Sequence, residues 1–127
     1  MILLDTHYLI WALLESSKLS EKAKALMVDS EKLCFFSAAS IWEIEIKQRT
    51  GKIRLPGNFY EKLNETGFLE LPVHTAHAAG IRHLPDIHKD PFDRLLLAQA
   101  IYEQWTFLTA DAALLQYQDH YNKIIRI

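Results

Sequence analysis

Short apolar runs alternate with longer stretches of helical pattern along the whole chain. Short runs rich in apolar residues and bounded by polar or turn residues predict buried strands. Such runs occur at residues 2–4, 33–36, 68–71, 105–109 and 124–127. Apolar residues spaced three or four apart predict helices between these strands. They lie at residues 7–14, 21–29, 59–64, 74–83, 92–104 and 112–116, with another that opens at Ser37 and runs to about residue 49.

Polar and turn residues mark the ends of these elements. Ser, Thr and Asp satisfy free N–H groups at helix starts, proline suits the first helical position, and glycine suits the residue after a helix. The predicted boundary residues are the caps Thr6, Ser20 and Asp111, the start Asp90-Pro91 and the stop Gly51. Residues 51–58, which contain Pro56-Gly57, are predicted to form a loop or protrusion.

Strands that alternate with helices predict a mostly parallel sheet with helices on both faces, because each crossover must return to the same end of the sheet. We therefore expect an α/β/α sandwich in a single domain that spans residues 1–127. In such folds ligands bind where the strands end and the following helices begin.

Four acidic residues occupy strand ends and helix starts of this pattern: Asp5, Glu43, Asp93 and Asp111. Each also has a purely structural explanation. Asp5 can bind backbone donors of its turn, Ser40-x-x-Glu43 matches a capping box, and Asp93 and Asp111 fit helix starts. Glu43 can also pair with Lys47 one turn later.

The parallel topology brings these four acids to one edge of the sheet, whatever each does locally. Clustered carboxylates repel one another and call for a counter-cation. Oxygen-rich sites select Mg²⁺ or Mn²⁺, which can lower the pKa of a bound water for attack on phosphorus. The hydroxyls of Thr6 and Ser40 are placed to support such a site, although capping alone explains either.

Four segments that contain these acids, in this order, resemble the signatures of PIN-domain proteins, and more narrowly of the ribonucleases in VapC-type toxin–antitoxin pairs. They are Leu3-Leu4-Asp5-Thr6-His7, Ser37-Ala38-Ala39-Ser40-Ile41-Trp42-Glu43, His88-Lys89-Asp90-Pro91-Phe92-Asp93-Arg94-Leu95 and Leu108-Thr109-Ala110-Asp111. The resemblance covers the whole chain in order and spacing.

The resemblance implies an α/β/α fold, Mg²⁺- or Mn²⁺-dependent endoribonuclease activity, a homodimer and inhibition by a cognate antitoxin protein. By position, Asp5, Glu43, Asp93 and Asp111 match the metal-binding catalytic acids, and Thr6 and Ser40 match the supporting hydroxyls. Asp90 is interpreted as a helix cap. Ala112 and Ala113 follow Asp111, where some members carry a further acid.

Basic residues near the acids are candidates for contact with an RNA backbone. Lys47, Arg49, Lys52 and Arg54 follow Glu43 closely, and Arg94 adjoins Asp93, although a solvated helix end or pairing with the site's acids explains them equally well. The net charge of −2, from 14 basic and 16 acidic residues, at first argues against an RNA partner. Setting the four site acids aside leaves 12 acidic residues and a balance of +2, which is compatible with RNA.

The other polar and aromatic candidates favour structural roles. Tyr8, Leu9, Trp11 and Trp42 are predicted core residues, and the single Cys34 is predicted to be a buried, unreactive thiol. The pair His74-x-x-His77 has helical spacing for Zn²⁺ but lacks a recognisable third ligand.

Two other functions fit an α/β/α chain of this length. One is a catalytically inert PIN-like module that binds RNA or protein, and the other is a phosphoacceptor receiver domain. Receiver domains usually carry adjacent acids after the first strand, whereas Asp5 stands alone here. The longest uninterrupted apolar run, residues 8–14, is far shorter than the roughly 20 residues of a membrane span. We therefore expect a cytoplasmic protein with no membrane partner.

Overall fold

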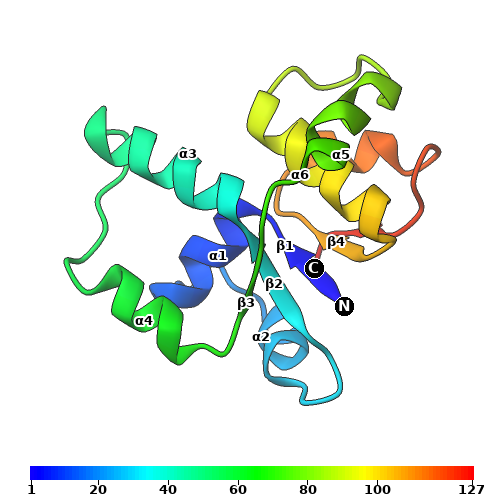
Figure 1. Cartoon of the computed structure of the whole chain (residues 1–127). Helices are drawn as coiled ribbons and strands as arrows, with labels where there is room; N and C mark the ends of the chain where they lie inside the picture. Colours follow the sequence, from blue (N-terminus) through cyan, green and yellow to red (C-terminus); the bar gives the residue numbers. More distant parts are fainter.

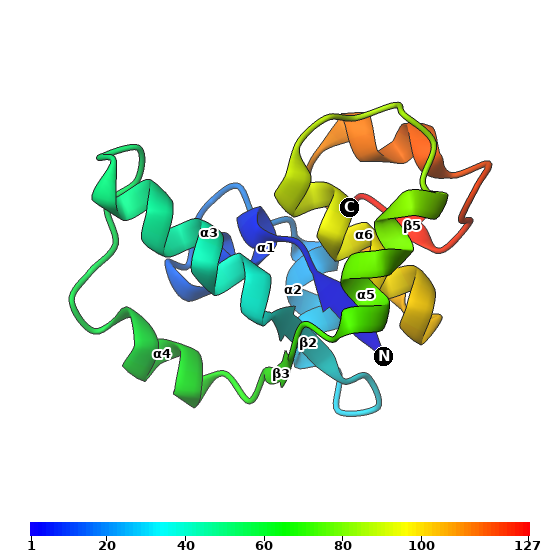
Figure 2. The same cartoon turned by 45° about the horizontal axis from the view of Figure 1, so that its top comes forward.

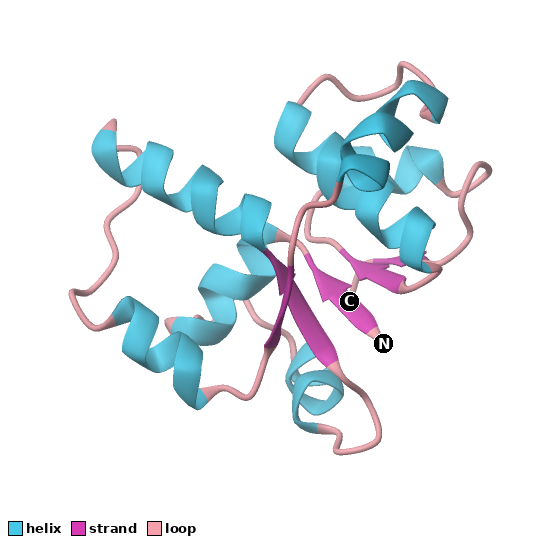
Figure 3. Cartoon of the chain, in the orientation of Figure 1, coloured by secondary structure: helices cyan, strands magenta, loops and turns pink.

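Five parallel strands form the centre of the molecule in the computed structural model, which describes residues 1–127 (Figures 1 and 3). The strands are β1 (Ile2–Leu4), β2 (Cys34–Ser37), β3 (Leu69–Leu71), β4 (Thr106–Leu108) and β5 (Ile124–Ile125). They lie in the order β3-β2-β1-β4-β5, and every neighbouring pair is parallel. The predicted strands and their parallel arrangement are confirmed, with ends that differ by at most two residues.

Helices cover both faces of this sheet. They are α1 (Thr6–Leu13), α2 (Glu21–Val28), α3 (Ala38–Arg49), α4 (Phe59–Glu65), α5 (Thr75–Gly80) and α6 (Pro91–Glu103), with the 3₁₀ helices η1 (Ile81–His83) and η2 (Ala112–Tyr117). In both views α3 and α4 extend to one side of the sheet and α5 and α6 lie on the other, with only the start of α3 close to α6 (Figures 1 and 2). None of the helices has the length and apolarity that crossing a membrane requires.

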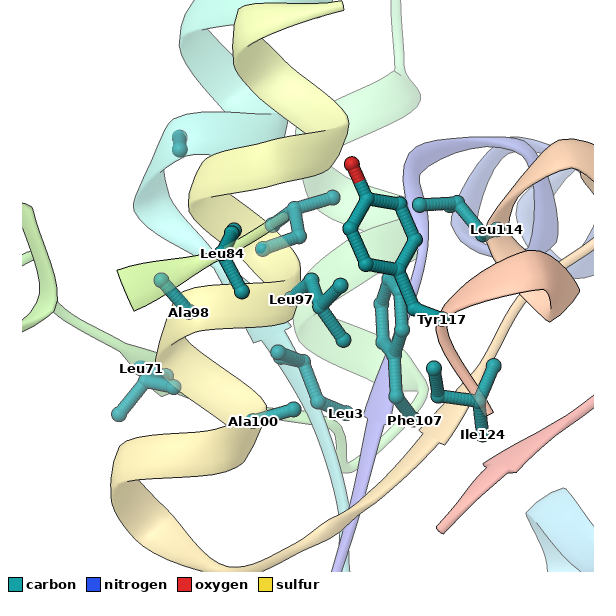
Figure 4. Close-up of a cluster of buried hydrophobic side chains, with 12 residues drawn as sticks. Leu3, Leu71, Leu84, Leu97, Ala98, Ala100, Phe107, Leu114, Tyr117 and Ile124 are labelled. Carbon is teal, nitrogen blue, oxygen red and sulfur yellow. The ribbon is translucent and has the colours of Figure 1, made fainter. Parts of the chain in front are cut away.

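Alternating side chains of β1 explain the two helical layers. Leu3 packs with buried residues of α6 and η2, among them Leu97 and Tyr117 (Figure 4). Ile2 and Leu4 point to the opposite face and pack with residues of α1 and α2. Because successive strand residues face opposite ways, a strand that is apolar throughout can bury both faces at once. The predicted α/β/α sandwich is thus confirmed.

The helix starts predicted from the sequence are confirmed at four places, and the predicted cap is wrong at one. Ser20, Asp90 and Asp111 each accept a backbone hydrogen bond as N-caps, as predicted, and Ser37, predicted only to open a helix, is the N-cap of α3. The predicted cap Thr6 is wrong, because Asp5 is the N-cap of α1 and accepts from Tyr8 N at 2.8 Å. The helix predicted at residues 74–83 is divided into α5 and η1.

The strand order also fixes where a ligand site is expected. From β1 the chain moves outward through β2 to β3, then returns to the other side of β1 for β4 and β5. The carboxyl ends of β1 and β4 therefore flank the point at which the order reverses, where such folds have a crevice. The order also differs from the 2-1-3-4-5 order of receiver domains, which excludes that alternative.

Candidate functional site

Asp5 lies at the point where the strand order reverses and is fixed there on both sides. Its Oδ1 accepts the α1 hydrogen bond from Tyr8 N, and its Oδ2 accepts from Thr109 Oγ1 and Ala110 N, both at 2.8 Å. Asp5 is 1% exposed. Burial raises the pKa of its carboxyl, while these three hydrogen bonds and the charge of His7 lower it. The carboxylate therefore joins the ends of β1 and β4.

Glu43 lies on the buried side of α3, next to the start of α1, which Asp5 caps. Its Oε1 accepts from Thr6 Oγ1 at 2.8 Å, and the same hydroxyl lies 2.9 Å from Ser40 Oγ. The capping-box explanation of Ser40 and Glu43 is wrong, because Ser37 caps α3 and both residues lie inside the helix. Thr6 and Ser40 thus support the position of a buried carboxylate.

Lys47 pairs with Glu43 one turn along α3. Its Nζ is 2.5 Å from Glu43 Oε2. Burial by itself lowers the pKa of Lys47, but the hydrogen bond to Glu43 and the charges of Glu43, Asp90 and Asp93 raise it above its ordinary value. The ion pair that the sequence left as an alternative is therefore present, and the lysine faces the acidic site.

Asp93 and Asp111 form the outer part of the site together with a histidine. His88 Nε2 lies 2.8 Å from Asp93 Oδ2 and 3.6 Å from Asp111 Oδ2. One ligand atom from each of these three residues lies within 4.8 Å of the other two, a spacing that can hold a metal ion. All three side chains are partly accessible to solvent, whereas Asp5 and Glu43 are buried.

Negative charge accumulates around Asp93. Burial, together with the charges of Asp90, Glu43 and Asp5, raises the pKa of its carboxyl to about 6, against a lowering by the His88 hydrogen bond. Asp5 and Glu43 therefore act electrostatically on Asp93, although only Asp93 and Asp111 share a metal-binding spacing. Asp90 is a helix cap, as predicted, since its Oδ1 accepts from Asp93 N at 3.0 Å.

His88 is the site residue that sequence reasoning did not select. It belongs to the same segment as Asp93, five residues before it, and this proximity was the available signal. A loop residue has no periodicity from which its direction can be read, so its approach to Asp111 depended on the tertiary fold.

Arg94 contacts the chain itself. Its Nη1 donates to Pro85 O, His88 O and Tyr117 Oη at 3.0, 3.2 and 3.1 Å. The guanidinium thereby ties the loop before α6 to η2. These contacts give Arg94 a positioning role, and its contact with substrate stays a prediction.

The other predicted substrate contacts lie at the far end of α3. Arg49, Lys52 and Arg54 are exposed, and none forms a salt bridge. Gly51, with φ of +76°, ends the helix between them. They form a basic segment that begins two residues after Lys47.

The predicted core residues divide into buried and exposed ones. Tyr8 and Leu9 are buried as expected and Trp11 is partly buried, but Trp42 is 61% exposed. Its ring packs edge-on against Phe92 at a centroid distance of 5.2 Å, which links α3 to the start of α6. Trp42 lies on the opposite side of α3 from the core, so its assignment to the core was wrong.

Cys34 and His77 are structural, in line with the sequence interpretation. Cys34 is buried in β2, and burial raises the pKa of its thiol. His77 is fully buried, accepts from His74 N through Nδ1 and lies 2.9 Å from Glu103 through Nε2. Both ring nitrogens are thus occupied within the fold, which excludes the His74–His77 zinc site.

Comparison with known proteins gives one family and several similar folds. The model of the PIN domain family matches residues 2–119. No curated protein matches the chain in sequence.

Similar solved structures cover nearly the whole chain. A chain of VapBC2 from Rickettsia felis, solved bound to a DNA fragment from its promoter, has a TM-score of 0.67 at 14% identity and covers 100% of this chain and 98% of its own. A toxin-antitoxin complex from Klebsiella pneumoniae gives 0.67 at 14% identity, covering 98% and 96%. FitAcB from Neisseria gonorrhoeae gives 0.63 at 19% identity, covering 100% and 96%.

Proposed function

Because the chain belongs to the PIN domain family, we propose that it is a divalent-metal-dependent endoribonuclease and the toxin of a type II toxin–antitoxin pair. The observation that carries this proposal is the convergence of Asp93, Asp111 and His88 within 4.8 Å, beside the buried carboxylates of Asp5 and Glu43. The proposed catalytic and metal-binding acids are Asp5, Glu43, Asp93 and Asp111.

The residues of this site fit Mg²⁺ or Mn²⁺. Asp93 Oδ1 has no hydrogen-bond partner within the chain, and the cluster of acids holds more negative charge than Lys47 and His88 offset. Carboxylate oxygens are the ligands that these hard cations prefer. When bound, the cation supplies an acidified water and neutralises charge on the leaving oxygen of a phosphodiester.

The protein's own residues contribute position and charge. Asp5 holds the ends of β1 and β4 together. Thr6 orients Glu43 by a direct hydrogen bond, and Lys47 offsets one charge of the cluster. Asp93 and Asp111 present carboxylate oxygens to solvent, where a phosphodiester can approach.

The basic segment of α3 and its following loop supports RNA as the substrate. Arg49, Lys52 and Arg54 are exposed and free of internal ion pairs. Exposed arginine and lysine side chains bind phosphate groups and release counterions from the nucleic acid. An RNA strand bound by these residues would run along α3 toward Glu43.

An apolar groove supports a cognate antitoxin as partner. A groove of about 540 Å³ lies between α1, α2 and the chain before β3, and its lining includes Leu19, Met27, Val28 and Phe68. Val28 is 81% exposed, so an apolar protein segment can bury surface there. One of the similar solved structures is a toxin-antitoxin complex.

We also propose a cytoplasmic location and a homodimer, the latter testable by light scattering.

Cleavage of single-stranded RNA tests the proposal against an inert binding module. We expect cleavage with Mn²⁺ or Mg²⁺, none with EDTA, and a loss of at least about 100-fold in Asp93→Asn. Asp119→Asn, which removes an exposed acid elsewhere, is the matched control and should cleave normally. Metal binding without cleavage by the wild-type protein would instead identify an inert module.

A further inference from the structure

His88 lies between the two partly exposed carboxylates of the site. Its Nε2 is 2.8 Å from Asp93 Oδ2 and 3.6 Å from Asp111 Oδ2. These three atoms come from three separate places in the chain: the loop before α6, the first turn of α6 and the cap of η2. Nitrogen and oxygen atoms that converge from different elements on one small volume are typical of metal ligands.

The backbone of His88 is held in place by two residues that do not themselves belong to the cluster. Tyr117 Oη accepts from His88 N at 2.9 Å, and Arg94 Nη1 donates to His88 O at 3.2 Å. Tyr117 is fully buried, and Arg94 Nη1 also donates to its hydroxyl at 3.1 Å. The peptide groups on both sides of His88 are therefore fixed, and the imidazole is aimed at Asp93.

Two other cationic side chains near the site, Lys47 and Arg94, make contacts elsewhere. Lys47 pairs with Glu43, and Arg94 contacts backbone carbonyls and Tyr117. His88 is thus the only nitrogen-bearing side chain in the group that can hold a metal ion. A neutral imidazole offers a lone pair to a cation, which the ammonium and guanidinium groups cannot.

We propose that His88 is a nitrogen ligand of the site's cation and that it favours Mn²⁺, as a first-row transition dication, over Mg²⁺. This inference rests on the proposed function of the same site. A purely oxygen-lined site suits Mg²⁺, whereas an imidazole ligand adds affinity for transition metals and little for Mg²⁺. The histidine therefore shifts toward Mn²⁺ a site that carboxylates alone would leave open to either dication.

Spectroscopy of bound Mn²⁺ tests the ligand directly and without any activity measurement. Electron spin echo envelope modulation of the Mn²⁺-loaded protein should show a coordinated ¹⁴N, and that signal should be absent from His88→Ala. His83→Ala removes an exposed histidine outside the cluster and should keep it. A wild-type protein that binds Mn²⁺ without a ¹⁴N signal would overturn the inference.

Calorimetric titration tests the metal preference. We expect His88→Ala to weaken Mn²⁺ binding by at least about tenfold and Mg²⁺ binding by less than about threefold. His88→Gln, which keeps a polar side chain, should behave as His88→Ala if it remains folded by circular dichroism. Equal losses for both metals, or no loss, would overturn the inference.

These results also separate the inference from the proposed function. RNA cleavage together with Mn²⁺ binding that lacks ¹⁴N coordination would leave the nuclease proposal intact and remove His88 as a ligand. A wild-type protein that binds neither Mn²⁺ nor Mg²⁺ would overturn both.

Discussion

The acidic site has an inner and an outer half, and the carboxylates of the two halves differ in burial and in hydrogen bonding. In the inner half, Asp5 and Glu43 are buried, and each of their carboxylate oxygens accepts at least one hydrogen bond from the chain itself. In the outer half, Asp93 and Asp111 are partly exposed, and Asp93 Oδ1 has no partner within the chain.

The two halves therefore differ in how much each acidic residue contributes to the fold, which depends on how many of its oxygens the rest of the chain occupies. Satisfied carboxylates stabilise the native state and add fixed negative charge to the site. Unsatisfied ones repel each other, and a cation relieves that repulsion. The comparison predicts different losses from substitutions in the two halves.

Removal of an outer carboxylate should abolish activity and spare the fold. We expect Asp111→Ala to lower RNA cleavage about 1,000-fold, since a metal ligand stabilises the transition state by several kcal/mol. Its stability should fall by only about 1 kcal/mol, the value of the η2 cap to Ala113 N. Cleavage assays and urea unfolding of one preparation give both numbers. Loss of activity through global unfolding would contradict the distinction.

Removal of an inner carboxylate should damage the fold itself. Asp5→Ala loses the α1 cap and leaves Thr109 Oγ1 and Ala110 N without their acceptor. We expect the free energy of unfolding to fall by about 3 kcal/mol, measured by urea denaturation. Asp29→Ala, at the exposed end of α2, is the control. A loss below about 1 kcal/mol for Asp5→Ala would show that the two halves do not differ in this way.

The outer half should also make the metal-free protein less stable as the pH rises. The folded-state pKa of Asp93, about 6, lies above its ordinary value of 3.8, so its contribution to stability is full below about pH 4 and lost as pH rises through 6. Asp93→Asn should remove this dependence and raise stability at pH 7 by about 1 kcal/mol, a value reduced for solvent screening. Melting temperatures of the wild-type protein and Asp93→Asn, measured in EDTA from pH 4 to 7, test this prediction. Equal slopes of melting temperature against pH in the two proteins would contradict it.

The smallest effect is expected from the basic segment, which lies outside both halves. Replacement of Arg49, Lys52 and Arg54 together by alanine should weaken the salt dependence of single-stranded RNA binding. The slope of the logarithm of the binding constant against the logarithm of the salt concentration should fall in magnitude by up to about 2, since each phosphate contact contributes about 0.7. Binding measured with EDTA present separates this effect from cleavage. Replacement of Lys18, Lys22 and Lys32 by alanine is a control of equal charge change. An unchanged slope would remove these residues from the RNA site.

Local patterns in the sequence predicted much of the architecture because they depend on neighbouring residues. The apolar runs gave five strands near their true positions, and Ser20, Asp90 and Asp111 cap helices as expected. The cap of α1 was placed at Thr6 and not at Asp5 because both residue types suit the N-cap position and the two are adjacent. Backbone dihedrals select between them, and the extended conformation belongs to Asp5.

Contacts between distant segments were beyond the reach of those patterns. Trp42 is apolar and lies one residue from buried Glu43, yet it is on the exposed side of α3. Helical periodicity places the two on different sides but does not say which side meets the core. The contacts of Thr6 in α1 with Ser40 and Glu43 show that their side of α3 faces inward. Arg94 likewise contacts residues 6 to 23 positions away.

The sequence by itself determined the order of strands and helices, the helix caps and the edge of the sheet at which acids gather, because short-range periodicity and chain direction are written in consecutive residues. The tertiary structure alone decided which of those acids are satisfied internally, and that His88 joins Asp93 and Asp111 within 4.8 Å. The reason is that ligand distances arise from the packing of separate elements, here the loop before α6 against η2, which no single segment specifies.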